Sequence, residues 1–303
     1  MNLNLVHLVF ALTLDGTVAS PFALFDLPRR FPRAFREVTC GRATPCGDCH
    51  EAAGCPWFPL FGQHLSTDPE AVKRHQKPPL PFVFAVPLLA SGESAAEDVE
   101  IGLTLVGSAV NHAGDFIRAM ERYCAGEMTG ANLVITLDGV SAQGLFGERS
   151  AVRMSRRGEL SGDLRILAAE DIAGKSVSDK ENVALNFLTP LRQLREGRLL
   201  RNLDCSAFLR MLIRRVSSLV AAYGGGELDA DFRWLSELSR EIEVMDNALI
   251  FAPGTGPNTA GVQGSVCLAG ELAPFLPYLY LGEYLHAGKG ASWGFGRFEL
   301  RDL

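Results

Sequence analysis

Residues 182–223 read NVALNFLTPLRQLREGRLLRNLDCSAFLRMLIRRVSSLVAAY and combine two hydrophobic periods. The apolar run 182–188 stops at Thr189-Pro190, as a strand does, because proline cannot donate a ladder hydrogen bond. Between residues 208 and 223 apolar side chains recur every three or four positions, which predicts a helix with one buried face. Glycines 224–226 end that helix. The second half of the chain therefore begins with a strand followed by a helix.

The elements that follow complete a known supersecondary unit. Asp229 or Asp231 is expected to cap a second helix, and Pro274 stands near the start of a later one. The expected strands are 248–251, 262–268 and 293–303, and the later helix is 275–285. Apart from the additional helix, this is the β-α-β-β-α-β order of a ferredoxin-like unit.

The first half repeats this order around an insertion. Strands are expected at 2–14, 81–89, 101–106 and 132–140, and helices at 31–38 and 116–124. A segment rich in cysteine and proline, at about 39–79, interrupts the unit after its first helix. We therefore predict an α+β fold of two tandem ferredoxin-like domains. Residues 1–174 form the first, with the Cys-rich insertion, and residues 181–303 form the second, after the polar stretch GKSVSDKE.

Composition excludes several classes of protein. Of the 303 residues, 47% are hydrophobic and 21% are charged, which excludes a disordered chain, a collagen and a coiled coil. The longest apolar runs fall short of the roughly 20 residues of a membrane helix, and the first residues lack the basic region of a signal peptide. We expect no membrane partner, a cytoplasmic location and seven cysteines outside any disulfide framework.

The most informative motif lies near the C-terminus, where residues 284–298 read YLHAGKGASWGFGRF. Glycines allow a backbone to approach a ligand closely, and successive amides in such a loop can bind an anion. Lys289 and Arg297 add positive charge. The order of residues is not that of a phosphate-binding P-loop, and the segment follows a helix, unlike a dinucleotide fingerprint. The alternative is a tight connection between a helix and an edge strand.

Four segments carry a resemblance to a known family. The pattern LxxGxxxHxGKGxxxGFGRFEL, with VALNFLTPLR, FLRMLIRRVSSL and IGLTLVGSAV, resembles the CRISPR-associated endoribonucleases of the RAMP (repeat-associated) superfamily, which cut precursor CRISPR RNA. The resemblance covers most of the chain and implies two tandem ferredoxin-like domains. One segment departs from it, because residues 251–259 read FAPGTGPNT where members often carry arginine or serine.

The resemblance implies an endoribonuclease that cleaves CRISPR precursor RNA within the repeat. The 2′-OH would attack the adjacent phosphate without a catalytic metal, leaving 2′,3′-cyclic phosphate and 5′-OH ends. The implied partners are CRISPR repeat RNA and other CRISPR effector subunits. The alternative is a non-catalytic RNA-binding RAMP subunit, which the net charge of −6 and the neutral segment 251–259 favour.

This chemistry needs a proton acceptor and a cation at the phosphate. His286 is the first candidate for the general base because it stands beside the glycines and Lys289, and His64 and His75 follow. The resemblance more often implies a base in the first domain. Seven arginines against two acids between residues 192 and 215 predict an RNA-binding patch despite the global charge. The predicted RNA-binding residues are Gly288, Gly290, Gly294, Gly296, Arg297, Arg210, Arg214 and Arg215.

The insertion contains a candidate metal site. Its cysteines have the spacing C-x5-C-x2-C-x5-C, and four thiolates satisfy a tetrahedral zinc ion; the residues are Cys40, Cys46, Cys49 and Cys55. An iron–sulfur cluster uses the same number of ligands, and four free thiols are the remaining alternative. Four sulfur ligands leave no open position for water, so a metal at this site would be structural and not catalytic.

Overall fold

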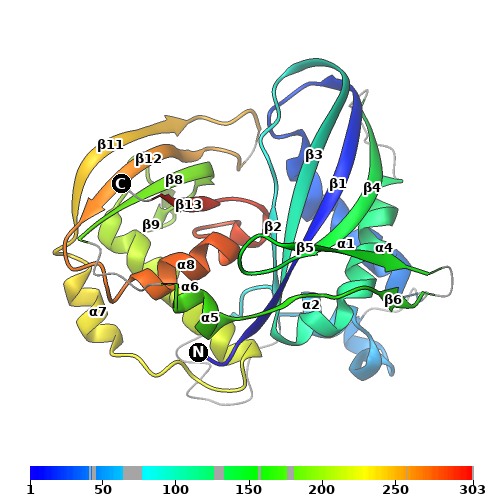
Figure 1. The fold of residues 1–303 in the computed structure, drawn as a ribbon, viewed down its shortest axis with the longest axis horizontal. Helices are drawn as coiled ribbons and strands as arrows, with labels where there is room; N and C mark the ends of the chain where they lie inside the picture. The colour runs from blue at the N-terminus through cyan, green and yellow to red at the C-terminus, as the bar shows by residue number, and fades with distance from the viewer. Residues whose placement is uncertain are drawn as a thin grey trace.

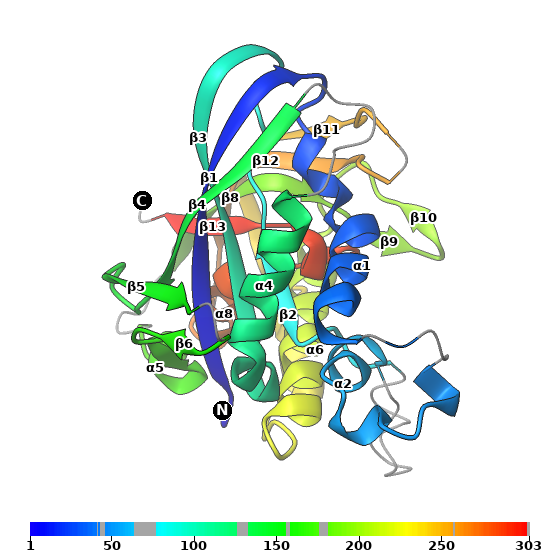
Figure 2. The same cartoon turned by 90° about the vertical axis from the view of Figure 1, so that its right-hand side faces the viewer.

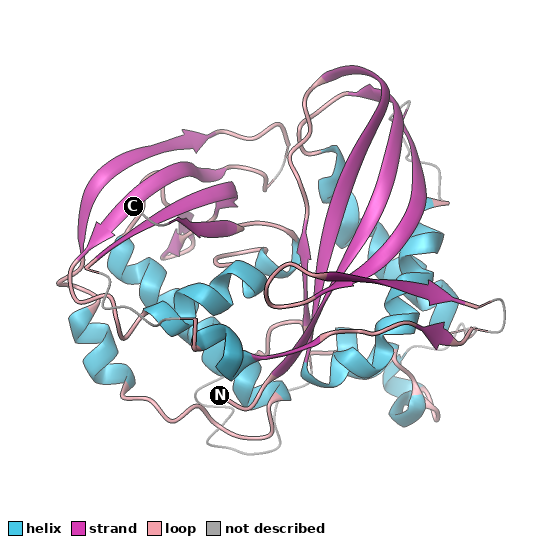
Figure 3. Ribbon diagram, viewed as in Figure 1, coloured by secondary structure: helices cyan, strands magenta, loops and turns pink. Residues whose placement is uncertain are grey.

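The computed structural model describes residues 1–40, 42, 46–63, 77–125, 133–155, 158–175, 181–256 and 258–301. His64 and His75, two of the three candidate bases, lie outside these ranges. Most of the described strands gather in two antiparallel sheets, one on each side of the molecule (Figure 3), and two short strands form a separate hairpin. None of the helices in the described ranges combines the length and the hydropathy of a membrane span.

The first sheet has the strand order of a ferredoxin-like unit. Its strands run in the order β2-β3-β1-β4, and β5 and β6 continue the sheet beyond β4 while β7 pairs with β1. The helices α1 and α4 lie together on one face of this sheet (Figures 1 and 2). The bounds are β1 Asn4–Val18, β2 Phe82–Ala85, β3 Gly92–Val106, β4 Leu133–Gln143, β5 Arg149–Met154, β6 Leu160–Ser161, β7 Ile166–Ala168, α1 Leu27–Thr39 and α4 Ala113–Cys124.

Short helical turns complete the first half. The 3-10 turn η1 leads into α1, and η4 leads into α4. The Cys-rich insertion lies between α1 and β2, as predicted, and carries η2, η3 and α2. The bounds are η1 Ala23–Asp26, η2 Cys46–Asp48, η3 Ala52–Gly54, α2 Trp57–Phe61 and η4 Gly107–His112.

The second sheet repeats the same order, β11-β12-β8-β13, so the predicted tandem ferredoxin-like fold is confirmed. Its face is covered by α6 and α8, with α7 beside α6 and a small hairpin, β9–β10, before α6. The bounds are α5 Ala169–Ala173, β8 Asn182–Leu191, β9 Leu194–Arg195, β10 Arg198–Leu199, α6 Cys205–Tyr223, α7 Phe232–Leu238, β11 Glu243–Ala252, β12 Gly261–Ala269, α8 Leu276–Leu285, η5 Ala291–Trp293 and β13 Phe298–Arg301.

Carboxylate caps fix the starts of two helices in this half. The Asp204 side chain accepts from the Ala207 amide at 2.9 Å and begins α6. The Asp231 side chain accepts from the amides of Arg233 and Trp234 and begins α7, so Asp231 and not Asp229 is the cap. Each bond satisfies an amide that has no partner within the helix.

Two strand ends differ from the prediction. The strand β8 continues through Pro190 to Leu191 because Pro190 lies beside an irregularity in its pairing with β12, where proline is tolerated. The last strand begins at Phe298 and not at Trp293, because residues 291–293 form the turn η5.

The two halves pack against one another through a continuous apolar core. Leu5 and Val106 of the first sheet are fully buried in the same cluster as Leu185 of β8 and Leu279 of α8. Ile172 of α5 belongs to this cluster as well, so α5 packs with the second half. A second cluster lies between the first sheet and its own helices. This arrangement fixes both sheets relative to the segment that joins α8 to β13.

Candidate functional site

The glycine-rich loop, residues 286–297, joins α8 to β13 and is wedged between the two halves. The Phe295 ring packs on Phe25 of η1 with centroids 4.9 Å apart. The Trp293 ring stacks on Phe84 of β2 at 5.8 Å. A Cβ atom on Gly294 would lie 3.0 Å from the Val86 side chain, so glycine permits the close approach. The loop, which belongs to the second half of the chain, therefore packs directly against residues of the first half.

The Thr-Pro turn of β8 anchors this loop. The Thr189 hydroxyl donates to the Gly294 carbonyl at 2.7 Å and accepts from the Arg297 amide at 2.9 Å. The Gly296 amide donates to the Pro190 carbonyl at 3.0 Å. Because three hydrogen bonds hold the loop to this turn, the loop has a defined shape before any ligand binds.

Two amides of the loop remain open. Gly288 and Gly290 are half-buried with φ of 86° each, and neither amide donates a hydrogen bond to any residue in the described ranges. Lys289 stands between them with an exposed side chain, while its own amide donates to the Arg192 carbonyl at 3.0 Å. Two unpaired N–H groups beside an ammonium form a binding position for an anion such as a phosphate.

The other two glycines serve packing. The Gly294 amide donates to the Ala291 carbonyl and the Gly296 amide to the Pro190 carbonyl, and both residues are buried. A Cβ atom on Gly296 would lie 1.9 Å from the Ala287 carbonyl oxygen. In this structure the two glycines, which were predicted to contact RNA, are buried and allow neighbouring backbone segments to approach closely.

His286 lies inside the protein, away from the exposed edge of the loop. Its residue exposure is 1%, and its backbone has a φ of 55° at the end of α8. Burial, followed by the nearby charges of Arg297 and Arg215, lowers the pKa of His286 well below its usual value. Its Nδ1 atom has no partner among the described residues. The structure therefore does not bring His286 and Lys289 together at the surface, and the imidazole is not accessible from solvent in this conformation.

Burial of His286 predicts loss of stability in acid. Below about pH 6.5 the unfolded chain binds a proton on this histidine and the folded chain does not, so protonation favours unfolding. His7, whose pKa burial and then Arg297 lower to about 4, acts in the same direction. The free energy of unfolding should fall by up to about 1.4 kcal/mol per pH unit for each such group. Urea titrations at about pH 7.5 and about pH 5 measure it, and His286→Gln should lessen the difference. An equal difference in the variant would contradict this assignment.

The predicted arginines divide into two groups. Arg215 is directed toward the loop and positions it: its Nε donates to the Leu285 carbonyl at 2.8 Å and its Nη2 to the Ser292 hydroxyl at 3.2 Å. Burial lowers its pKa to about 10. Arg210 and Arg214 are exposed and, with Arg195 of β9, line a cavity of about 440 Å³ between α6 and the β9–β10 hairpin.

Arg297 is half-buried and lies 3.6 Å from the Glu299 carboxylate. Burial lowers the pKa of Arg297. Its guanidinium therefore has a carboxylate partner within the protein.

Arg192 belongs to the predicted arginine patch, but its contacts beside the loop are not indicated by the sequence. Arg192 lies over the Phe295 ring at 5.3 Å and donates to the Asn258 side chain at 3.1 Å. The Thr255 hydroxyl hydrogen-bonds to Ser20 of the first half at 2.6 Å. The neutral segment 251–259 therefore holds Arg192 beside the loop, and nothing in its composition indicates that contact.

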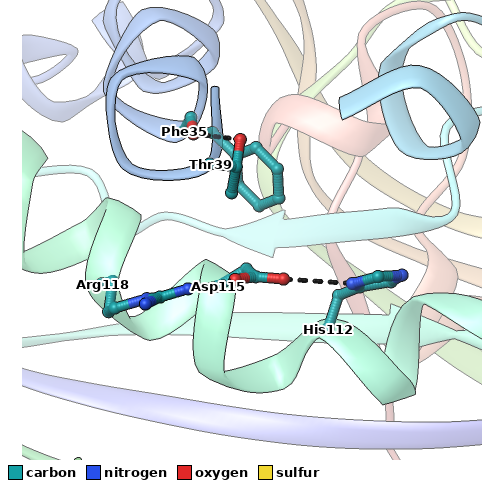
Figure 4. A network of polar contacts seen from close by, with 5 residues as sticks. All are labelled: Phe35, Thr39, His112, Asp115 and Arg118. Carbon is teal, nitrogen blue, oxygen red and sulfur yellow. Dashed lines mark hydrogen bonds and ion pairs between the residues drawn. The ribbon is translucent and has the colours of Figure 1, made fainter. Parts of the chain in front are cut away.

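A histidine oriented by a carboxylate lies at the start of α4 (Figure 4). The His112 Nδ1 and an Asp115 oxygen are 3.0 Å apart, and Arg118 binds the other Asp115 oxygen. The His112 side chain is 29% exposed. The spacing H-x-x-D at a helix start is the sequence signal, because residues three apart share a helix face. Among the described histidines, His112 is the one that is both accessible and held by a carboxylate, whereas His286 is enclosed and the half-buried His7 hydrogen-bonds to the Thr104 hydroxyl at 2.9 Å.

The four insertion cysteines lie in one region of the molecule. Cys40, Cys49 and Cys55 line a cavity of about 350 Å³, and the Cys49 amide donates to the Cys46 carbonyl at 3.4 Å. All four are free of disulfides. Within the described ranges, however, no three histidine, cysteine or acidic side chains lie close enough to hold a metal ion. A shared metal would require the thiols to approach one another more closely.

We keep the structural metal as a prediction. Elemental analysis of purified protein should find about one zinc per chain, or iron if a cluster forms, because four clustered thiolates bind such ions. Replacing Cys49 by serine should remove the metal and lower the melting temperature, and Cys124→Ser, at a buried cysteine outside the insertion, should leave the metal content unchanged. Metal-free wild-type protein with four reactive thiols would contradict the prediction.

Comparison with known proteins places these features in a family context. The family model of the CRISPR-associated endoribonuclease Cas6 matches residues 185–298, which include the glycine-rich loop, and a model of an N-terminal domain matches residues 30–162. A comparison with curated proteins gave no match.

Solved structures with the same fold extend over nearly the whole chain. A product complex of Thermus thermophilus Cas6 is 14% identical, with a TM-score of 0.59, and the match covers 98% of this chain and 100% of that one. A substrate-mimic complex of another Cas6 is 18% identical, with a TM-score of 0.55 and coverage of 98% and 99%. A partial Cas6-RT-Cas1–Cas2 complex is 13% identical, with a TM-score of 0.52, covering 99% of this chain and 46% of that one.

Proposed function

We propose that this chain, a RAMP-type CRISPR protein with a Cas6 domain, is an endoribonuclease that cleaves CRISPR precursor RNA within the repeat. The observation that carries the proposal is the pair of unpaired amides at Gly288 and Gly290 on either side of an exposed Lys289. These groups are suited to the oxygens of a scissile phosphate, and the anchored loop holds them in place in advance.

The proposed reaction uses the RNA as its own nucleophile. The 2′-OH loses its proton to a base and attacks the adjacent phosphorus, the bond from phosphorus to the 5′-oxygen breaks, and that oxygen takes a proton from an acid or from water. The products carry a 2′,3′-cyclic phosphate and a 5′-OH. The Gly288 and Gly290 amides and the Lys289 ammonium stabilise the charge that develops on the phosphate. Because His286 is buried, we assign it a positioning role and look for the base among His64, His75 and His112.

The nucleophile can be tested directly. A repeat RNA with a single 2′-deoxy nucleotide at the cleavage position should remain intact, while the unmodified RNA is cut in the presence of EDTA. Cleavage of the deoxy substrate, or loss of cleavage in EDTA that added metal restores, would rule out this mechanism.

The second candidate function is a non-catalytic RNA-binding RAMP subunit. The burial of His286 favours it, since the loop then offers RNA a cation and amides but no imidazole. Binding of repeat RNA without any cleavage would support this candidate. We propose repeat RNA and other CRISPR proteins as partners under either function.

The exposed arginines predict how RNA binding depends on salt. Replacing Arg210 and Arg214 together by alanine should lower the affinity for repeat RNA and reduce the slope of log affinity against log salt by about one unit per lost phosphate contact. Arg165→Ala is the matched control, because Arg165 is already paired with Asp163. An unchanged slope in the double variant would place the RNA elsewhere.

A further inference from the structure

The exposed face of α6 separates two cavities. On one side Arg210 and Arg214 line the basic cavity beside the β9–β10 hairpin. On the other side the same two arginines line a second cavity, of about 370 Å³, between α6 and α7. The two helices lie next to each other at one end of the molecule (Figure 1), and the Ser206 and Ser239 hydroxyls hydrogen-bond at 2.8 Å. A chain that follows the first cavity therefore passes the mouth of the second.

The second cavity has an apolar interior and a charged rim. Ile213 is 5% exposed, whereas the Phe232 residue is 43% exposed and presents its ring at the opening. Glu227 lines the cavity too, so its rim carries both charges. Arg214 makes no hydrogen bond or ion pair with any residue in the described ranges. An exposed aromatic ring next to a free guanidinium is a combination that unpaired nucleotides use, because the base stacks and the phosphate pairs.

We propose that this cavity is a subsite for one unpaired nucleotide of the RNA, with its base against Phe232 and its phosphate on Arg214. The inference rests on the proposed RNA substrate and assigns it a second contact, away from the glycine-rich loop. Charge complementarity selects the occupant, since Arg210 and Arg214 line both cavities and attract a polyanion to this opening.

The test of the subsite separates the contribution of the RNA base to affinity from that of the sugar–phosphate chain. Fluorescein-labelled 12-nucleotide RNAs, oligo(C) and oligo(U), are compared by anisotropy with an abasic 12-mer of the same number of phosphates. The wild type should bind oligo(C) about 5- to 150-fold more tightly than the abasic strand, which is the usual size of one stacked base. Phe232→Ala should abolish most of that ratio and leave binding of the abasic strand unchanged.

Two further variants make the test specific. Phe232→Tyr should keep the ratio, because tyrosine stacks equally well, and its thermal unfolding shows whether the site tolerates substitution. Phe146→Ala removes an 87% exposed phenyl group from the first half and should leave the ratio unaltered. A ratio unchanged in Phe232→Ala, or a wild type that does not distinguish bases from abasic sites, would overturn the subsite. If the wild type does not distinguish bases from abasic sites, an apolar protein partner becomes the remaining candidate for this cavity.

Cleavage is measured separately on repeat RNA, so that the two proposals can fail independently. Base-dependent binding that is lost in Phe232→Ala supports the subsite even where no RNA is cut. If Phe232→Ala has the same ratio of oligo(C) to abasic affinity as the wild type while repeat RNA is still cut, the subsite is overturned and the proposed endoribonuclease activity stands.

Discussion

Replacing Gly296 by alanine should destabilise the protein by about 3 kcal/mol and reduce RNA cleavage at least 100-fold. The new Cβ atom would lie 1.9 Å from the Ala287 carbonyl oxygen, and neither atom can rotate away, because the oxygen belongs to the backbone and the Cβ position is fixed by it. Overpacking of this kind costs about 1–3 kcal/mol, and alanine at a φ of 60° adds its own strain. The Gly296 amide would be drawn from the Pro190 carbonyl, so Gly288 and Lys289 would lose their fixed position.

The matched control is Gly147→Ala in the turn between β4 and β5. Gly147 has a φ of 86°, but a Cβ atom there would meet nothing within 4 Å, so this variant carries only the conformational cost of about 1 kcal/mol. Urea unfolding gives the stability difference, and single-turnover cleavage at saturating RNA gives the rate. Equal losses of stability and of cleavage rate in the two variants would contradict the prediction, because they would show that the loop tolerates displacement.

The fold was predictable because its elements differ clearly in hydrophobic period. The run in β8 and the periodic stripe of α6 are separated by polar residues, and each half contains six such elements in one order. The last strand was placed too early because GFGRF alternates as a strand does. Glycines at positive φ instead hold residues 291–293 in a turn, and this conformation depends on the contacts with Phe25 and Val86.

The burial of two site residues, Arg215 and His286, has a signal in the sequence. Arg215 follows Leu212 by three positions and precedes Leu219 by four, so it falls on the apolar stripe of α6, whereas Arg214 points away from it. The helix before His286 is apolar on nearly every side, and such a helix lies in the interior. A residue at its end is therefore buried, although the neighbouring glycines and Lys289 suggested a surface position.

The contacts of Arg192 could not be predicted in the same way. Arg192, which follows β8, contacts Asn258 and the Phe295 ring, and both lie more than 60 residues away in the sequence. Hydrophobic periodicity reports local secondary structure and therefore does not indicate contacts between distant residues. The four cysteines show the opposite case, because their spacing is clear in the sequence while no metal-ligand geometry is present among the described residues.

The second large effect concerns the general base. Replacing the correct histidine should slow the single-turnover step by about 10²- to 10⁴-fold while RNA binding persists, since proton transfer contributes that much to such reactions. The comparison uses His64→Ala, His75→Ala, His112→Ala and His286→Gln in EDTA at saturating RNA. We expect one of the three first-half variants to show this loss, together with a flatter dependence of the rate on pH.

His286→Gln should behave differently, because the residue supports the loop from inside. Its cleavage rate should fall less than 10-fold at a temperature where the variant is fully folded, with the pH dependence of the rate unchanged. The side chain is enclosed by α8, β1 and the loop, and a proton acceptor must come within hydrogen-bond distance of the 2′-OH to act. A 10²-fold loss in His286→Gln with an altered pH profile would show that the loop opens on RNA and exposes this imidazole. Wild-type rates in all three first-half variants would exclude the remaining histidines proposed as the base.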